Sequence, residues 1–448
     1  MESQAAPLEV GLRVRLSVMM FLQYAIWGAW LPLLWPFLAG HRGFSANQIG
    51  NMFAVGAVGA IVAPFIAGQI ADRWFATEKY LALSHALGGV LIWQLASLES
   101  YGQFLAFSLA YSLLYSPTMP LTNSLAFHHL PDRDRDFGRV RVWGTVGWIA
   151  VGIGIGQWLL YRHTPSSGSA QEILAAQSAG MADAFRLSAA LGLFLGGFCL
   201  LLPHTPPKQG DKSFATAEAL GEIKRQPLLT LFLLAVPISC IHQFYFVHTA
   251  PFLGAIQARL GDGTGAAVAL GEWINRFVGV GGGGLMTLGQ MSELVVLSAV
   301  PLFARRFHRK TLLCVGTLAY AARMALFAFA APIASATGLS EVLVAAVGVT
   351  LHGPVFAFWI FLAFLIVDEE TTGDVRASAQ SLFNLVIVGV GVIVGSKIAA
   401  WVSDWATVDG TLDYTRLFGV PMWASLACLV VLLVAYPGGR RASTAVSA

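Results

Sequence analysis

The chain has 448 residues, of which 56% are hydrophobic and only 11% are charged. Soluble globular proteins carry roughly 25% charged residues, so this composition excludes an ordinary soluble protein and indicates that most of the chain avoids water. The net charge of +3 is too small and too dispersed to indicate nucleic-acid binding.

Long apolar segments run through the whole sequence. A helix needs about 20 largely apolar residues to cross the hydrocarbon core of a bilayer, because its backbone amides must be paired inside lipid. This length predicts twelve transmembrane helices near residues 15–39, 47–71, 80–98, 102–127, 140–161, 184–203, 228–255, 281–304, 311–333, 342–367, 377–402 and 415–436. The predicted fold class is therefore an all-α membrane protein.

The basic residues are distributed unevenly along the predicted helices. With the amino terminus in the cytoplasm, nineteen of the 27 Lys and Arg residues fall on the cytoplasmic side and six fall outside. This bias predicts that both termini are cytoplasmic. The remaining two, Arg323 and Lys397, lie inside predicted helices, and we interpret them as ion-pair partners or snorkelling residues with structural roles.

A polar, basic stretch at 204–227 separates six predicted helices in 1–203 from six in 228–448. This layout resembles that of the major facilitator superfamily. The segment between the second and third helices is similar to the superfamily's G-x-x-x-D-R gating loop, with Asp72 and Arg73 as its charged pair, and a degenerate copy follows the eighth helix at 302–310. The resemblance implies two similar halves that rock about a site near the bilayer midplane.

Polar side chains in the middle of a membrane helix are costly, so each is a functional candidate. The fifth predicted helix places Arg141, Thr145 and Trp148 on one face, where they offer a cation, a hydroxyl and an aromatic plane. Alternatively, Arg141 snorkels to the interface and Trp148 packs in the core.

The carboxy-terminal half carries a second set of candidates. Glu293 is the one carboxylate deep inside a predicted helix, and Gln290 points the same way because it lies three residues earlier. Glu293 could accept hydrogen bonds from a substrate, exchange protons, or pair with an intramembrane cation. Gln243 and His352 are further candidates, with Phe356 as a stacking surface one turn from His352.

Several other patterns do not indicate chemistry. The glycine run at 281–284 lacks a following Gly-Lys-Ser/Thr, so we interpret it as a close-packing or flexible segment rather than a phosphate loop. The pair His128 and His129 falls in a predicted loop without metal-ligand spacing. No enzyme, metal or cofactor signature is present. Four free, buried thiols are expected, at Cys199, Cys240, Cys314 and Cys428.

Four segments make the chain similar to the bacterial nucleoside/proton symporter family of this superfamily: 22–30, 141–147, 290–293 and 376–380. The resemblance implies a monomeric transporter of a bacterial inner membrane, with a nucleoside and protons as its cargo. It also implies nucleoside contacts at Arg141, Thr145, Trp148, Gln243, Phe246, Gln290, Glu293, His352 and Phe356.

Three positions depart from the family's pattern. The family usually has a polar amide where Phe246 stands and a tyrosine where His352 stands. Both changes would alter which nucleosides or related solutes fit, so the resemblance does not determine the preferred solute. Its pattern also places an aspartate that serves proton coupling where Ala357 stands, and alanine binds no proton. Either Glu293 or His352 has taken over coupling, or the protein moves solute only downhill, or the aspartate has been replaced artificially.

Three functional hypotheses follow from these residues. The principal one is a nucleoside transporter that works by alternating access. The second keeps the fold but changes the cargo to a sugar or a modified nucleoside. The third is a solute sensor that binds without transport, although a protein that does not move has no need of the gating loop.

Overall fold

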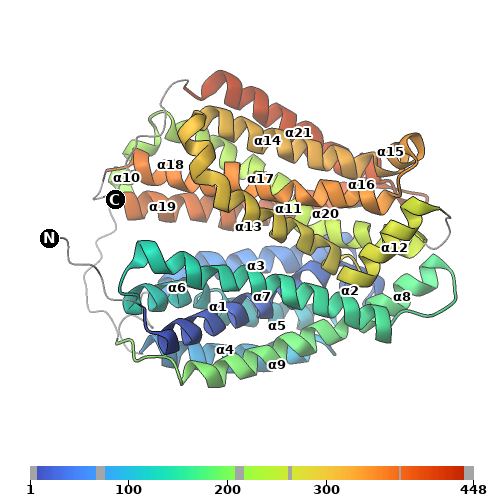
Figure 1. Ribbon diagram of the computed structural model, residues 1–448, viewed down its shortest axis with the longest axis horizontal. Helices are drawn as coiled ribbons and strands as arrows, with labels where there is room; N and C mark the ends of the chain where they lie inside the picture. The colour runs from blue at the N-terminus through green and yellow to red at the C-terminus, as the bar shows by residue number, and fades with distance from the viewer. Residues whose placement is uncertain (1–7, 67–75, 207–215, 261–264, 373–374, 438–448) are drawn as a thin grey trace. The chain divides into compact units, whose positions relative to one another are not determined.

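A computed structural model describes residues 8–66, 76–206, 216–260, 265–372 and 375–437, and these residues are almost entirely helical (Figure 1). The exceptions to helix and loop are two short antiparallel strands, β1 Thr407–Val408 and β2 Thr411–Leu412. Nine helical stretches within the described residues are long and apolar enough to cross a membrane. The chain divides into two compact units, residues 1–211 with 277–284, and residues 212–276 with 285–448.

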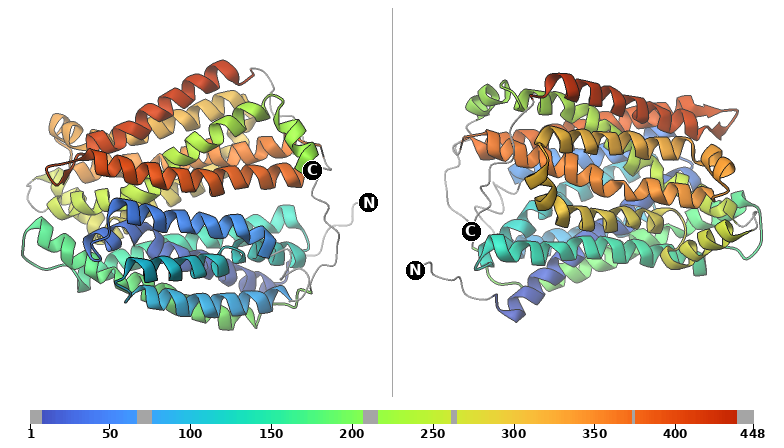
Figure 2. Two further views of the ribbon diagram at one scale, coloured as in Figure 1. Left: turned by 180° about the vertical axis from the view of Figure 1, so that it is seen from behind. Right: turned by 45° about the horizontal axis from the view of Figure 1, so that its top comes forward.

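The first unit is built from helices that pack in pairs. Its helices are α1 Val10–Trp30, η1 Leu31–Leu33, α2 Leu34–Gly40, α3 Ala46–Ile66, α4 Thr77–Leu95, α5 Tyr101–Tyr115, α6 Thr118–His129, α7 Arg133–Arg162, α8 Ala170–Gly180 and α9 Ala182–Cys199. The most extensive packing joins α1 to α7 and α4 to α9, and these pairs run side by side in Figures 1 and 2. Between α5 and α6 the chain turns at Pro117, which divides one predicted apolar segment into two helices.

The second unit contains the remaining helices, apart from the last two residues of α12 and the first two of α13, which belong to the first unit. They are α10 Thr216–Ile223, α11 Leu228–Arg259, α12 Ala266–Val278, α13 Gly283–Arg306, α14 Arg309–Ala328, α15 Ala330–Thr337, α16 Glu341–Thr350, α17 His352–Val355, α18 Leu362–Glu370, α19 Arg376–Asn384, α20 Gly391–Ala406 and α21 Tyr414–Ala435. Two wide π turns, η4 Phe356–Phe361 and η5 Leu385–Val390, interrupt this series. Here α14 packs along α21, and α11 along α20.

The glycine run before α13 packs tightly against α7 in the first unit. The Val280 backbone amide donates to the Gly156 carbonyl oxygen at 3.0 Å, and the side-chain Nε2 of Gln157 donates to the Phe277 carbonyl oxygen at 2.7 Å. Gly279 has a φ of +81°, and a Cβ atom there would lie only 1.9 Å from the Gly156 carbonyl carbon. Backbones can approach this closely only where side chains are missing. The run is therefore a close-packing segment.

Candidate functional site

The predicted stripe on α7 lies against the aromatic residues of α1. The guanidinium carbon of Arg141 is 4.0 Å from the ring centroid of Tyr24, a distance at which a cation is attracted to the ring face. The Trp148 ring meets Trp27 edge to face, with centroids 5.6 Å apart. Arg141, Thr145 and Trp148 are all half-buried. The first unit thus brings two of its three predicted site residues into contact with α1.

A buried ionisable cluster forms around His352 in the second unit. Its Nδ1 atom is 3.1 Å from Nη1 of Arg323, and its Nε2 atom is 3.5 Å from Oε2 of Glu293. The imidazole ring stacks on Tyr245 with centroids 4.9 Å apart and lies 6.2 Å from the ring of Phe356. The structure therefore groups three predicted site residues, Glu293, His352 and Phe356, from two different predicted helices.

Two glycines allow the helices of this cluster to approach closely. A Cβ atom on Gly353 would lie 2.4 Å from the Ser292 hydroxyl oxygen and 2.6 Å from the Ser292 carbonyl oxygen. A Cβ atom on Gly289 would lie 2.9 Å from the Tyr245 hydroxyl oxygen and 3.0 Å from Cβ of His352. Because both positions lack a side chain, α13 reaches α17 and brings its carboxylate beside the imidazole.

The chain widens into a π turn one helical turn after His352. Pro354 has no backbone N–H to donate, and the next helical residues, Phe356 to Phe361, adopt the wider turn η4. Phe356 is half-buried on this turn, whereas the adjacent Ala357 is completely enclosed, with an exposed fraction of 0%. The position where the family's pattern has an aspartate is thus filled here by a packed methyl group.

The remaining predicted residues of this unit lie on α11 and α13. Gln243 and Gln290 are buried, with exposed fractions of 6% and 7%. Within the described part of the chain, Oε1 of Gln290 has no hydrogen-bond partner, so this acceptor is available to a ligand. Phe246 is half-buried and meets the His242 ring edge to face at 5.1 Å.

Arg323 also belongs to this cluster, although its sequence position had been interpreted as structural. Its side chain has an exposed fraction of 0%, and its guanidinium carbon lies 4.2 Å from the Tyr245 ring centroid and 5.2 Å from that of Tyr320. The sequence did indicate this role in one respect: Arg323 lies near the middle of the predicted helix 311–333, and a cation at that depth is a functional candidate by default. Lys397, interpreted in the same way, is exposed on α20.

A separate polar cluster lies at the start of α4, before the predicted membrane segment. Glu78 accepts hydrogen bonds from the Thr205 backbone amide at 3.0 Å and from Nδ1 of His204 at 2.8 Å. Burial acts to raise the pKa of Glu78, but these hydrogen bonds outweigh it and hold the pKa below its usual value. His129 also joins this cluster, with Nε2 2.8 Å from the Thr205 hydroxyl.

Other sequence predictions have varied outcomes. The gating-loop residues Asp72 and Arg73 lie outside the described residues. His128 and His129 occupy the last turn of α6 rather than a loop, because α6 extends two residues beyond the predicted membrane segment. All four cysteines are free; Cys199 and Cys428 are buried, whereas Cys240 and Cys314 are half-buried. The described residues contain no group of three or more potential metal ligands.

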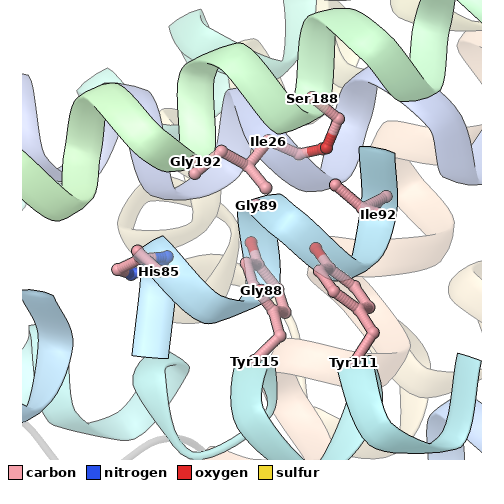
Figure 3. Close-up of a pocket in the computed structure, with 9 residues that line it drawn as sticks. All are labelled: Ile26, His85, Gly88, Gly89, Ile92, Tyr111, Tyr115, Ser188 and Gly192. Carbon is pink, nitrogen blue, oxygen red and sulfur yellow. The ribbon is translucent and has the colours of Figure 1, made fainter. Parts of the chain in front are cut away.

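A narrow cavity in the first unit is separate from the predicted site. It lies between α1, α4, α5 and α9, and Figure 3 shows the rings of Tyr111 and Tyr115 side by side along it. His85 on α4 and Ser188 on α9 complete its polar lining, and the Ser188 hydroxyl donates to the Ile26 carbonyl oxygen at 2.8 Å. No predicted substrate contact lines this cavity.

Apolar helices in two units, with an ionisable cluster inside one of them, are typical of a polytopic membrane protein, and solved structures share this fold. A crystal structure of a single-residue mutant of the nucleoside transporter NupG superposes with a TM-score of 0.80 at 22% identity, covering 95% of this chain and 100% of that one. The structure of a D-xylose–proton symporter gives a TM-score of 0.67 at 13% identity, covering 95% and 98%. These likenesses establish the major facilitator fold.

Sequence comparison then gives the family. The model described as nucleoside H+ symporter matches residues 10–439, so the chain belongs to this family of transporters. The putative nucleoside transporter YegT of Escherichia coli K12 is 33% identical over 437 residues, covering 93% of this chain and 92% of the relative. The xanthosine permease of the same organism is 27% identical over 418 residues, covering 91% and 92%.

Proposed function

We propose that this protein carries nucleosides across a bacterial inner membrane by alternating access, as a monomer with both termini in the cytoplasm. In this proposal, twelve transmembrane helices form two six-helix halves, 1–203 and 228–448, joined by a cytoplasmic linker at 204–227. The observation that carries the proposal is the cluster of Glu293, Phe356 and the buried His352 in a chain of the nucleoside H+ symporter family.

The second unit supplies groups that suit a nucleoside. A ribose presents hydroxyl donors, which the Glu293 carboxylate and the unpaired Oε1 of Gln290 can accept. The half-buried ring of Phe356 offers a face on which a planar base can stack. Gln243 and Phe246 complete this set. Such a site rejects analogues that lack the hydroxyls, because its buried polar groups would remain unpaired.

From the first unit, we propose that Arg141, Thr145 and Trp148 contact the substrate. The Arg141 guanidinium is a donor-only group, the Thr145 hydroxyl both donates and accepts, and Trp148 provides an aromatic surface. All three are half-buried, so part of each side chain is accessible. Asp72 and Arg73 would form the gating loop of this half.

Proton coupling in this proposal depends on Glu293 and His352. Ala357 cannot bind a proton, and it is fully enclosed. Glu293 and His352 lie 3.5 Å apart and each has a side chain that can bind a proton, so we propose them as the groups that exchange a proton during transport.

The direct test is uptake of radiolabelled uridine and adenosine into proteoliposomes, with and without an inward proton gradient. We expect uptake above that of empty vesicles for at least one nucleoside, and stimulation by an acidic exterior. Uptake of neither nucleoside would refute the proposal. Uptake without any pH effect would leave a nucleoside facilitator.

Phe246 and His352 support a second candidate, a transporter of sugars or modified nucleosides with the same fold. Phe246 replaces a polar amide and packs edge to face on His242, which makes this part of the lining less polar. A thermal-shift panel separates the candidates, since stabilisation by hexoses and by no nucleoside would favour the second. A sensor that binds solute without moving it would show stabilisation but no flux.

A further inference from the structure

Arg323 is a buried cation of the second unit, and among the described residues it forms no ion pair with a carboxylate. Its exposed fraction is 0%, and its hydrogen bond runs from Nη1 to Nδ1 of His352 at 3.1 Å. Within the described residues, its Nε and Nη2 atoms have no hydrogen-bond partner, and its faces lie over Tyr245 and Tyr320. A buried cation with so few hydrogen bonds is costly, so its retention requires a function.

The chemistry of this contact determines where the proton of His352 resides. A guanidinium group has five N–H donors and no acceptor, so Nδ1 of His352 must be the acceptor and carries no proton. A neutral imidazole has a single N–H, which then lies on Nε2. This atom is 3.5 Å from Oε2 of Glu293, beyond the usual range for a strong hydrogen bond but close enough for a small rotation to form one.

The same contact opposes a second proton on His352. An imidazolium has N–H groups on both ring nitrogens, so it would place two donors, each carrying positive charge, face to face at the 3.1 Å contact with Arg323. His352 can therefore gain a proton only if it leaves Arg323. Glu293 has no such restriction, because a carboxyl group accepts in both protonation states.

Resting on the proposed function, we infer that Arg323 is a positioning residue: it fixes His352 as the Nε2–H tautomer facing Glu293, which leaves Glu293 as the proton-exchanging group. Arg323 also supplies the positive charge that balances the ionised Glu293. His352 then links the two without changing its own charge. In this inference Arg323 on α14 decides between the two candidate proton carriers, Glu293 on α13 and His352 on α17.

Other titratable groups also surround the imidazole. The His242 ring lies 5.7 Å from it, and Nδ1 of His242 is 2.8 Å from the Tyr320 hydroxyl. The Tyr245 ring centroid lies 4.9 Å from that of His352 and 4.2 Å from the guanidinium carbon of Arg323, so this tyrosine contacts both residues. Together with Glu293 on α13 and Arg323 on α14, these are the ionisable side chains that the described contacts place around His352.

The first experiment reads the tautomer directly. Protein with 15N-labelled histidine rings is reconstituted in nanodiscs, and the His352 resonances are assigned by their loss in His352→Gln. We expect one protonated nitrogen, Nε2, and one unprotonated nitrogen, Nδ1, throughout the pH range of uptake. In Arg323→Met we expect mixed tautomers. A proton on Nδ1 in the wild-type protein, or a doubly protonated ring at the pH of maximal uptake, would overturn the inference.

The second experiment measures the pH midpoint of nucleoside uptake. Because Arg323→Met removes a balancing cation, Glu293 should bind its proton more readily and the midpoint should rise by about one pH unit. Arg323→Lys, which keeps the charge and a donor, should restore the wild-type midpoint. The matched control, Tyr320→Phe, removes the hydroxyl contact with His242 and should leave the midpoint unchanged.

The outcomes separate this inference from the proposed function. Absence of nucleoside uptake by the wild-type protein would refute the transport proposal, while the 15N spectra would still decide the tautomer. Wild-type uptake whose pH midpoint persists in Glu293→Gln would exclude Glu293 as the proton carrier. If Arg323→Met does not fold, an unchanged midpoint in Tyr320→Phe together with a shifted midpoint in Arg323→Lys would contradict the role of the cation's charge.

Discussion

Replacement of Glu293 by glutamine removes the charge of the proposed site while retaining its size. The Glu293 side chain has an exposed fraction of 15% and lies 3.5 Å from His352, so it is largely screened from water. A hydrogen bond to a charged group contributes about 1.5–3 kcal/mol, and this difference corresponds to a roughly 10- to 150-fold change in Kd. We therefore expect Glu293→Gln to weaken nucleoside binding by a factor in that range.

Isothermal titration in nanodiscs with uridine and adenosine measures this change. The control is Glu341→Gln, which also removes a carboxylate from an ion pair of the second unit, the 3.0 Å contact with Arg259. That pair is partly exposed, so its loss should cost about 0–1 kcal/mol of stability and leave nucleoside binding unchanged. Equal affinities for the wild-type protein and Glu293→Gln would remove the carboxylate from the substrate site.

Three further predictions concern other parts of the chain. Gly353→Ala would force a methyl group to 2.4 Å from a hydroxyl oxygen of the facing helix, and should lower the free energy of unfolding by about 1–3 kcal/mol, measurable as a lower Tm. Thr205 and His204 hold the folded-state pKa of Glu78 below its usual value, so the stabilisation is fully present above that usual value and is lost as the pH falls through the lowered pKa; the Tm difference between wild type and Glu78→Gln should therefore shrink as the pH falls. Ala357→Asp should introduce pH-driven nucleoside accumulation in proteoliposomes, or increase it, and an unchanged pH profile would contradict this prediction.

The nine long apolar helices of the described residues could be predicted because length and apolarity are properties of single segments. Helix α11 begins at the predicted residue 228, and α21 lies within one residue of its predicted bounds at both ends. The helix α12 and the strands β1 and β2 were not predicted. With 13 residues, α12 is too short to meet a criterion based on membrane thickness, and each strand has only two residues.

The members of the candidate site could be predicted individually, but their arrangement could not. Glu293 and His352 stood out because polar groups in membrane helices are rare. Their proximity depends on Gly353, which lets α17 pack against the backbone of α13, and no sequence pattern specifies that approach. Arg323 was interpreted as structural because the sequence does not reveal which face of a helix meets its neighbours. Its burial between two tyrosines and a histidine is a tertiary property.

The inferred charge balance of the cluster predicts how a change at Ala357 should affect proton coupling. In the charge balance inferred above, ionised Glu293 offsets Arg323 while Ala357 carries no charge, so a proton on Glu293 leaves a buried cation uncompensated, which is unfavourable. Position 357 is fully enclosed, so an aspartate there would add a second buried negative charge to this unit, and one proton would then restore neutrality. The uptake profile of Ala357→Asp should therefore have its midpoint at a higher pH than that of the wild-type protein. A midpoint at the same or a lower pH would show that Arg323 and Glu293 do not balance each other during transport.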